Sequence, residues 1–168
     1  MRSEWVCEET LSHILAALTY ENRLACEVSL RTGLRIGDVL ALKTRKIFKC
    51  GRFTIKEQKT GKPRRIYLPQ DLLEKMRNNA GRFFVFENRV DPKKSRTRQA
   101  VFKDLKRAAR AFRVSENIAP HTMRKAFAVE WFEKTKDLKK VQALLNHSDE
   151  AVTVLYALAN CVDNKRKK

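Results

Sequence analysis

Apolar residues near the start of the chain recur at helical spacing. Between residues 8 and 31 these positions are Leu11, Leu15, Leu18, Leu24, Val28 and Leu30. Because the spacing is interrupted near "TYEN", we expect two helices rather than one. Gly33 favours the left-handed backbone that ends many helices. The apolar residues after it, Ile36, Leu40 and Leu42, predict the start of a third helix.

The stretch "GRFTIKEQKTGKPRRIYLP" instead shows the two-residue alternation of strands. Phe53 and Ile55 alternate with polar residues, Ile66 and Leu68 do the same, and "KTGKP" between them has the composition of a turn. We therefore expect a β-hairpin. The later stretch "RFFVFE" is typical of a short buried strand or an extended segment.

The remaining pattern is helical. "PQDLLEKMR" predicts a short helix, "DPKKSRTR" a basic loop, and the stripe of Val101, Leu105, Ala108 and Phe112 a helix over about 97–112. Further helices are expected over about 121–135, 138–145 and 149–160. The sequence shows neither an internal repeat nor a linker, so we expect one mainly α domain with a small β-hairpin, of the α+β class.

Composition adds a strong positive charge to this picture. The 168 residues include 37 Lys and Arg against 19 Asp and Glu, a formal charge of +18, while 43% of the residues are hydrophobic. A folded protein with this charge is expected to bind a polyanion, and nucleic acid is the commonest one. No apolar stretch approaches the roughly 20 residues of a membrane-spanning helix, and "MRSEWVCEETL" does not resemble a signal peptide. We expect a soluble cytoplasmic protein.

The cysteines give little support to a metal site. Cys7, Cys26, Cys50 and Cys161 are far apart, form no C-x-x-C pair and are accompanied by only three histidines. We expect buried, reduced thiols and neither a metal nor a cofactor.

Two short motifs near helix ends carry candidate chemistry, each with an ordinary structural alternative. His121 and Arg124 share a face in the first turn of a helix, where unpaired backbone N–H groups favour an anion, although a helix cap and a surface cation would look the same. Arg35 and Asp38 follow Gly33, where the guanidinium can reach a phosphate and the carboxylate can orient it. A surface ion pair is the alternative.

The hairpin and the C-terminal part supply the other candidates. Lys59 stands where the first predicted strand meets the turn, although most such lysines are solvated and Lys56 and Lys62 compete with it for any role. In "LLNHSDEAVTVLY", His147 lies at a helix end, and Tyr156 lies on or beside an apolar stripe. Taken alone, Tyr156 is typical of a core residue.

The order of these residues is more specific than any one of them. "TGLRIGDVLAL", "EQKTGKPRRIYLP", "HTMRKAFA" and "LLNHSDEAVTVLY" together resemble the catalytic domain of the tyrosine recombinase (phage integrase) family, over nearly the whole chain. The resemblance implies that Tyr156 is the nucleophile, that Arg35 and Arg124 clamp the phosphate, and that His121 and His147 are further active-site residues.

The resemblance also assigns supporting positions. Lys59 aligns with the hairpin lysine, and Asp38 takes the place of an acidic residue that supports the first arginine. Asn146 replaces a usual glycine, and Lys125 replaces a frequent histidine at a variable position. The implied function is a site-specific recombinase that cleaves and rejoins DNA through a 3′-phosphotyrosyl intermediate without metal or ATP. The alternatives are DNA relaxation of the type IB topoisomerase kind, or a non-catalytic DNA-binding relative.

Double-stranded DNA is the expected partner, with self-association into a tetrameric synapse by resemblance and no small-molecule substrate. Contacts to the DNA backbone are expected from Lys62, Arg64, Lys93, Lys94, Arg96, Arg98 and Lys125. The resemblance further implies a bacterial, phage or mobile-element protein that associates with the nucleoid.

Family members usually carry an additional N-terminal helical DNA-binding domain of the core-binding, SAM-like type. Because this chain begins almost directly at the catalytic helices, we expect residues 1–168 to form a single catalytic domain without it, either as a fragment or as a naturally short recombinase. Residues 157–168 are expected to form a short C-terminal tail. Whether Tyr156 serves its own active site or a neighbour's stays open.

Overall fold

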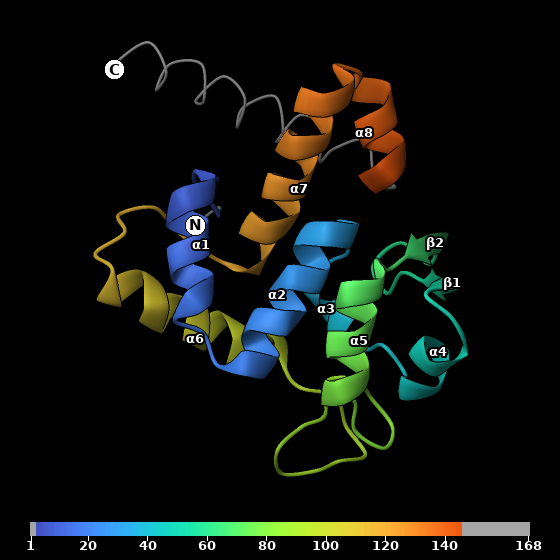
Figure 1. The fold of residues 1–168 in the computed structure, drawn as a ribbon. Coiled ribbons are helices and arrows are strands. Elements are labelled where there is room, and N and C mark those ends of the chain that lie inside the picture. Colours follow the sequence, from blue (N-terminus) through green and yellow to red (C-terminus); the bar gives the residue numbers. More distant parts are fainter. Residues whose placement is uncertain (1–2, 146–168) are drawn as a thin grey trace.

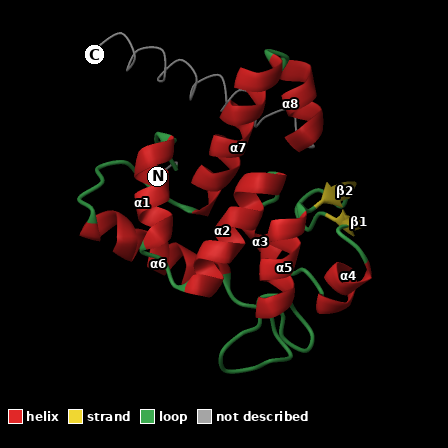
Figure 2. Ribbon diagram, in the orientation of Figure 1, coloured by secondary structure: helices red, strands yellow, loops and turns green. Residues whose placement is uncertain are grey.

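The computed structural model describes residues 3–145 of the chain, so Asn146, His147, Tyr156 and the expected last helix and C-terminal tail lie outside it (Figure 1). The helices of this part are α1 (Glu8–Ala16), α2 (Tyr20–Thr32), α3 (Ile36–Leu40), α4 (Thr44–Lys49), α5 (Gln70–Asn79), α6 (Arg98–Ala111), α7 (Pro120–Thr135) and α8 (Leu138–Leu145). Strands β1 (Arg52–Lys56) and β2 (Pro63–Tyr67) form a two-stranded antiparallel sheet. The expected mainly helical α+β fold with one hairpin is confirmed (Figure 2).

Helix α2 is the centre of the domain. It contacts α1, α3, α5, α6 and α7, and Figure 1 shows it between α1 and α6 on one side and α5 with the hairpin on the other. Its residues Leu24, Ala25, Cys26 and Val28 are at most 1% exposed. Burial raises the pKa of the Cys26 thiol to about 12, so this thiol stays protonated and inert.

Gly33 ends α2 for two physical reasons. Its φ of 64° lies in the left-handed region, which residues with a β-carbon rarely adopt. A β-carbon at this position would also lie 2.5 Å from the ring of Phe127 in α7. The glycine therefore lets α7 pack closely against the end of α2, and the chain turns there to present residues 34–38.

The hairpin follows the alternation in the sequence. Phe53 pairs with Ile66 and Ile55 with Arg64 across the two strands. Ile55 and Ile66 face the core at 8% and 5% exposure, and Gly61 adopts a φ of 66° in the turn that joins the strands. The inner face of the hairpin thus lies against the helical domain, and its turn projects beyond the core.

Several local expectations were wrong. Helix α4 was not predicted, because only Ile47 of its six residues is buried and so short a helix shows no period. By contrast, the stretch 82–87 lies outside the two-stranded sheet and makes isolated bridges at Phe84 and Glu87, in agreement with the second expected alternative, an extended segment. Phe112 is 48% exposed and stacks on His13 rather than entering the core.

The exposure of the cysteines and the hydropathy of the helices test two further expectations. Cys7 and Cys50 are exposed, whereas Cys26 is buried, so the expectation of buried thiols holds for only one of the three described cysteines. Among the helices of residues 3–145, we find none that is long and apolar enough to cross a membrane.

Candidate active site

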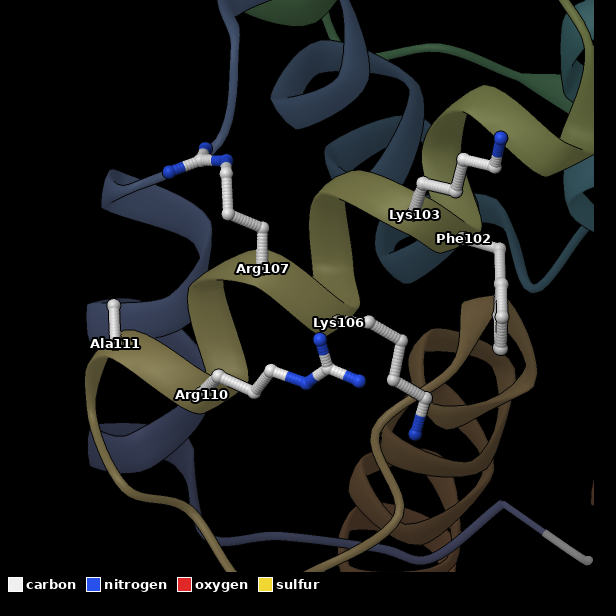
Figure 3. A pocket seen from close by; sticks show the side chains of 6 residues that line it. All are labelled: Phe102, Lys103, Lys106, Arg107, Arg110 and Ala111. Atoms are coloured by element: carbon white, nitrogen blue, oxygen red, sulfur yellow. The ribbon is translucent and has the colours of Figure 1, made fainter.

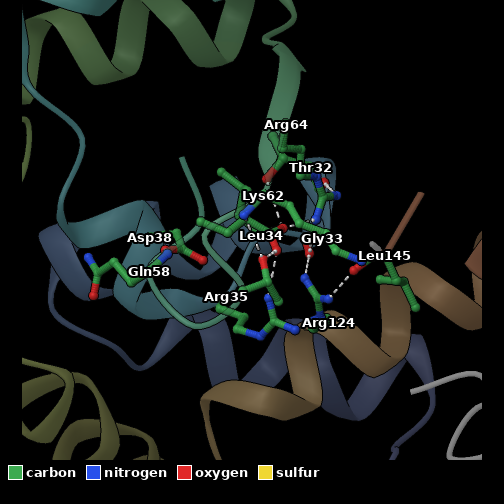
Figure 4. A network of polar contacts seen from close by, with 12 residues as sticks. Thr32, Gly33, Leu34, Arg35, Asp38, Gln58, Lys62, Arg64, Arg124 and Leu145 are labelled. Carbon is green, nitrogen blue, oxygen red and sulfur yellow. Dashed lines mark hydrogen bonds and ion pairs between the residues drawn. The ribbon is translucent and has the colours of Figure 1, made fainter. Parts of the chain in front are cut away.

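Four segments that are distant in sequence meet at the C-terminal end of α2. They are the turn after α2, the start of the hairpin loop, the first half of α7 and the end of α8 (Figure 4). Three arginines, Arg35, Arg64 and Arg124, are buried in this region at 8%, 9% and 3% exposure. Buried guanidinium groups are costly unless they are paired, so their contacts define the site.

Arg35 is held by a carboxylate from the hairpin. Its Nη1 donates to Oε2 of Glu57 over 2.9 Å, and Glu57 is fully buried. Arg64 donates from Nη1 to the other oxygen, Oε1, over 3.1 Å. A single carboxylate therefore joins the arginine that follows α2 to an arginine of β2.

The charge of Glu57 is secured by its neighbours. Burial by itself raises the pKa of this carboxyl, but hydrogen bonds from Arg64 and Thr60 and the charge of Arg35 outweigh it and leave the pKa below its usual value. Burial conversely lowers the pKa of Arg64, and the Glu57 carboxylate counteracts this effect. Both partners are held as ions.

Two backbone oxygens bind the Arg124 guanidinium. It donates from Nη1 to the carbonyl oxygen of Gly33 and from Nη2 to that of Leu145 over 2.6 Å. The first contact brings Arg124 next to the segment that carries Arg35. His121, one helical turn earlier, is exposed on the first turn of α7.

Asp38 anchors the hairpin from the other side. Its Oδ1 accepts a hydrogen bond from the backbone N–H of Gln58 over 2.9 Å, and the Gln58 side chain donates to the carbonyl oxygen of Gly37. Asp38 therefore contacts the residue beside Lys59, whereas the ion pair to Arg35 comes from Glu57. The start of α3 is tied to the hairpin turn.

Lys59 lies in this turn with an exposed side chain, and Lys56 and Lys62 are exposed as well. The two residues before Lys59 are both held in the arginine region, because Gln58 is bound by Asp38 and Glu57 is bound by Arg35 and Arg64. His147 and Tyr156, the other two predicted site residues, lie outside the described residues.

The predicted DNA-contacting cations separate into two groups. Lys62, Lys93, Lys94 and Arg98 are exposed. A β-carbon on Gly37 would lie 3.4 Å from the Arg98 side chain, which places Arg98 beside the start of α3. This first group lies at the surface and is available to a phosphate.

The second group makes contacts inside the protein. The Arg64 guanidinium binds Glu57 and the carbonyl oxygens of Thr32 and Gly33. Arg96, 9% exposed, donates from Nε to Oδ1 of Asn22 over 2.6 Å. Lys125 is half-buried and donates to the carbonyl oxygen of Ser3. The exposed cations of the first group are therefore better placed to contact DNA than those of the second group.

A further group of cations lines a hollow on α6. It is lined by Phe102, Lys103, Lys106, Arg107, Arg110 and Ala111, and Figure 3 shows that all these side chains spread from one helix. An open hollow of this kind, lined by four cations, fits the surface of a polyanion better than it fits an enclosed small molecule. Within residues 3–145 we find no group of three His, Cys, Asp or Glu placed to hold a metal ion.

Sequence reasoning missed Glu57, although the sequence contains a signal for it. In the two-residue period of the hairpin, Glu57 continues the inward positions Phe53 and Ile55, and Arg64 precedes the inward positions Ile66 and Leu68. Two opposite charges at inward positions on paired strands predict a buried ion pair. The hairpin alternation could therefore have identified this pair.

Comparison with known proteins now places the chain. Residues 4–161 match the model of the phage integrase family. The probable integrase/recombinase YoeC of Bacillus subtilis (strain 168) is 30% identical over 131 residues, which cover 76% of this chain and 71% of that protein. The tyrosine recombinase XerA of Pyrococcus furiosus is 31% identical over 132 residues, which cover 74% of this chain and 46% of that protein.

Solved structures show the same fold. A lambda integrase dimer bound to a COC′ core site has a TM-score of 0.74 at 24% identity, covering 93% of this chain and 48% of that one. The catalytic domain of bacteriophage HP1 integrase has a TM-score of 0.68 at 15% identity, covering 93% of this chain and 89% of that one. The chain thus spans about half the length of XerA and of the lambda integrase chain in that dimer. With a family match over almost its whole length, this protein belongs to the phage integrase family of tyrosine recombinases.

Proposed function

We propose that this protein is a site-specific recombinase that cleaves and rejoins double-stranded DNA through a covalent 3′-phosphotyrosyl intermediate. The observation that carries the proposal is the convergence of Arg35 and Arg124. Both are buried, both are fixed by protein contacts, and Arg124 binds the carbonyl oxygen two residues before Arg35. Family membership supplies the reaction class.

In this mechanism the Tyr156 oxygen attacks the phosphorus of a DNA phosphodiester. A tyrosine hydroxyl ordinarily has a pKa of about 10, so it needs a base to accept its proton. His121, exposed on the first turn of α7 beside Arg124, is the proposed base. The new bond joins the tyrosine oxygen to the 3′ phosphate, while the bond from phosphorus to the 5′ oxygen breaks.

The arginines act on the charge that develops during this step. As phosphorus becomes pentacoordinate, negative charge grows on its two non-bridging oxygens, and Arg35 and Arg124 bind them with permanently charged, planar groups. His147 donates a further hydrogen bond. Because both guanidinium groups are already fixed by the protein, little reorganisation is needed when the charge appears.

The leaving 5′ oxygen takes its proton from Lys59. This lysine stands on the exposed hairpin turn, and Asp38 and Glu57 fix the backbone on its N-terminal side. The free 5′ hydroxyl, or that of another duplex, can then attack the phosphotyrosine and restore a diester. The energy of the original bond is retained, so the proposed cycle consumes no ATP.

DNA binding is assigned to the exposed cations around the hairpin and α6. Lys62, Lys93, Lys94 and Arg98 contact phosphates and position the duplex without reading its sequence. One solved relative of similar fold is a lambda integrase tetramer bound to a Holliday junction, with a TM-score of 0.69. By analogy we propose that this protein also self-associates on DNA.

A trapping experiment tests the reaction. The protein is incubated with nicked suicide duplexes carrying a randomised core, and SDS-resistant protein–DNA adducts are recovered and sequenced. Wild type is expected to form an adduct, Tyr156→Phe to form none, and Tyr20→Phe, which changes an exposed tyrosine of α2, to match wild type. An adduct formed by Tyr156→Phe contradicts the mechanism. Relaxation of a plasmid without joined products points to the topoisomerase-like alternative.

A further inference from the structure

Glu57 is a fully buried carboxylate with an unusual set of partners. Its Oε2 accepts from Arg35 over 2.9 Å and from the Thr60 hydroxyl over 2.9 Å, and its Oε1 accepts from Arg64 over 3.1 Å. The partners come from three places: the segment after α2, the hairpin turn and β2. One side chain therefore connects the turn to the arginine region.

Such an arrangement is not explained by stability alone. Moving a carboxylate and two guanidinium groups out of water is costly, and well-packed apolar residues of similar volume often give equal or greater stability. A buried ionic network at the edge of a candidate active site instead suggests that the positions of its members matter. The contacts of Glu57 show which neighbouring groups it holds in place.

The backbone of Glu57 closes the hairpin turn. Its N–H donates to the carbonyl oxygen of Lys62 over 3.0 Å, and its carbonyl oxygen accepts from the N–H of Gly61 over 2.8 Å. The side chain then accepts from Thr60 inside the same turn. Lys59 lies between these fixed residues, so its position depends on the residue that also holds Arg35.

The network continues to the second arginine of the proposed clamp. Arg64 donates to the carbonyl oxygens of Thr32, over 2.6 Å, and Gly33, over 3.3 Å. The Gly33 oxygen also accepts from Arg124. Movement of Glu57 would therefore displace Arg35 directly and disturb the carbonyl group to which Arg124 is bound (Figure 4).

We propose that Glu57 is a positioning residue for DNA cleavage, which holds the Arg35 guanidinium and the Lys59 turn in one rigid unit without itself touching DNA. This inference rests on the proposed function. It assigns to a hairpin carboxylate the coordination of two separate events: stabilisation of charge on the phosphate by Arg35 and protonation of the leaving oxygen by Lys59.

The test measures single-turnover cleavage of a suicide duplex. Glu57→Gln keeps the shape of the side chain and removes its charge, and we expect the cleavage rate to fall on the order of 100-fold, the usual cost of displacing a reacting group by about 1 Å. DNA affinity is expected to stay within about twofold, because Glu57 is not on the DNA surface. Glu74→Gln, an exposed glutamate of α5, is the matched control and should cleave at the wild-type rate.

A modified substrate separates the two roles. In a 5′-bridging phosphorothiolate the leaving group is a thiolate, which departs without a proton, so the part of the defect that acts through Lys59 should disappear. We expect Glu57→Gln to be about tenfold slow on this substrate instead of about 100-fold, with the remainder acting through Arg35. Equal defects on both substrates contradict the coupling to Lys59.

Glu57→Asp guards against a folding artefact. It keeps the negative charge, and we expect it to recover at least about tenfold of the rate lost in Glu57→Gln. An Asp variant as slow as the Gln variant, or a Gln variant as fast as wild type, overturns the inference. If wild type itself forms no adduct, the proposed function fails instead, so the two failures are distinguishable.

Discussion

The two ends of α2 carry buried polar networks that look alike and differ in their cations. At the N-terminal end, Oδ2 of Asp104 accepts from the backbone N–H and hydroxyl of Thr19 and from the amide of Asn22 over 2.7 to 3.0 Å, while Oδ1 binds Arg107. At the C-terminal end, Glu57 is surrounded by Arg35, Arg64 and Thr60.

The donors show the difference. Asp104 accepts from neutral groups at a helix start and from one arginine, Arg107, whose side chain is 57% exposed. The buried Arg96 of this network donates to Asn22 and not to the carboxylate. The other network buries three guanidinium groups within one region. Holding a helix end needs only one carboxylate, whereas gathering several buried cations makes sense where an anion is to be bound. The charge of the donors, more than the presence of a buried carboxylate, therefore distinguishes the end of α2 that carries the proposed active site.

The largest difference in the rate of covalent adduct formation is expected between Arg124→Gln and Arg107→Gln. Arg124→Gln removes the proposed donor to the reacting phosphate and should lower the rate of covalent adduct formation by about 100 to 1000-fold. Arg107→Gln removes a partly exposed cation of the other network and should leave that rate within about twofold. Single-turnover cleavage of the suicide duplex measures both. Equal losses would show that the two networks do not differ in function.

A second expected difference is in stability, between substitutions at Gly33 and Gly61, two glycines with a left-handed backbone. Gly33→Ala adds both backbone strain and a clash with Phe127, and we expect it to lower the free energy of unfolding by about 2 to 4 kcal/mol. Gly61→Ala makes only an ordinary van der Waals contact, 3.7 Å from the Lys56 side chain, and should cost only about 1 kcal/mol. Urea unfolding of both variants is the measurement. A cost for Gly61→Ala as large as for Gly33→Ala would argue against close packing of α7 on this turn.

Asp104→Asn should affect stability and leave the chemistry unchanged. Loss of the charged acceptor is expected to reduce the free energy of unfolding by about 1 to 3 kcal/mol, while the folded protein should cleave DNA normally. Asp71→Asn, an exposed aspartate of α5, should change stability by no more than about 0.5 kcal/mol. A cleavage defect in folded Asp104→Asn would contradict the purely structural role of the N-terminal network.

The Asp104 carboxylate is expected to make the stability of the protein depend on pH. Burial raises the pKa of Asp104, but hydrogen bonds from Asn22, Thr19 and Arg107 outweigh it and leave the pKa below its usual value. Its stabilisation is therefore complete above the unfolded-state pKa and is lost as the pH falls through the lower folded-state value. Wild-type stability should decrease from about pH 5 toward pH 3, and Asp104→Asn should flatten this decrease. Urea unfolding across this range tests the sign.

The smallest effect is expected for the surface cations. Removing Lys93 and Lys94 together should weaken binding to all duplexes alike and reduce the slope of log affinity against log salt by about 1 to 2. Lys75→Ala changes an exposed lysine of α5 that pairs with Glu27 of α2, and it should leave the slope unchanged. Titrations of the protein with duplex DNA at several salt concentrations measure this slope. A change confined to one DNA sequence would indicate base contacts instead.

Much of this architecture was predictable from the sequence. Helices α2 and α6 were predicted because their core residues recur at 3.6-residue spacing, α7 was expected after Pro120, and Gly33 marked the end of α2. The convergence of Arg35 and Arg124 was expected only through family resemblance, since a local pattern does not report which distant segments meet.

The remaining features depend on tertiary packing. Helix α4 is too short to show a period. Phe112 continues the α6 stripe in sequence, but at the C-terminal cap of that helix it stacks on His13 at the surface. Arg96 looks like any other cation of a basic loop, and only its contact with Asn22 in α2 explains its burial. Glu57 and Arg64 are the exception, because the hairpin period placed both facing inward.

The way Arg124 is held has a further consequence. Two of its contacts are to backbone oxygens, at Gly33 and Leu145. A carbonyl group is supplied by every residue type, so these contacts fix the guanidinium without leaving any trace in the identity of the neighbouring side chains. Methods that search related sequences for pairs of residues that change together would therefore overlook them. These two contacts depend on the course of the main chain and not on the identity of the neighbouring side chains.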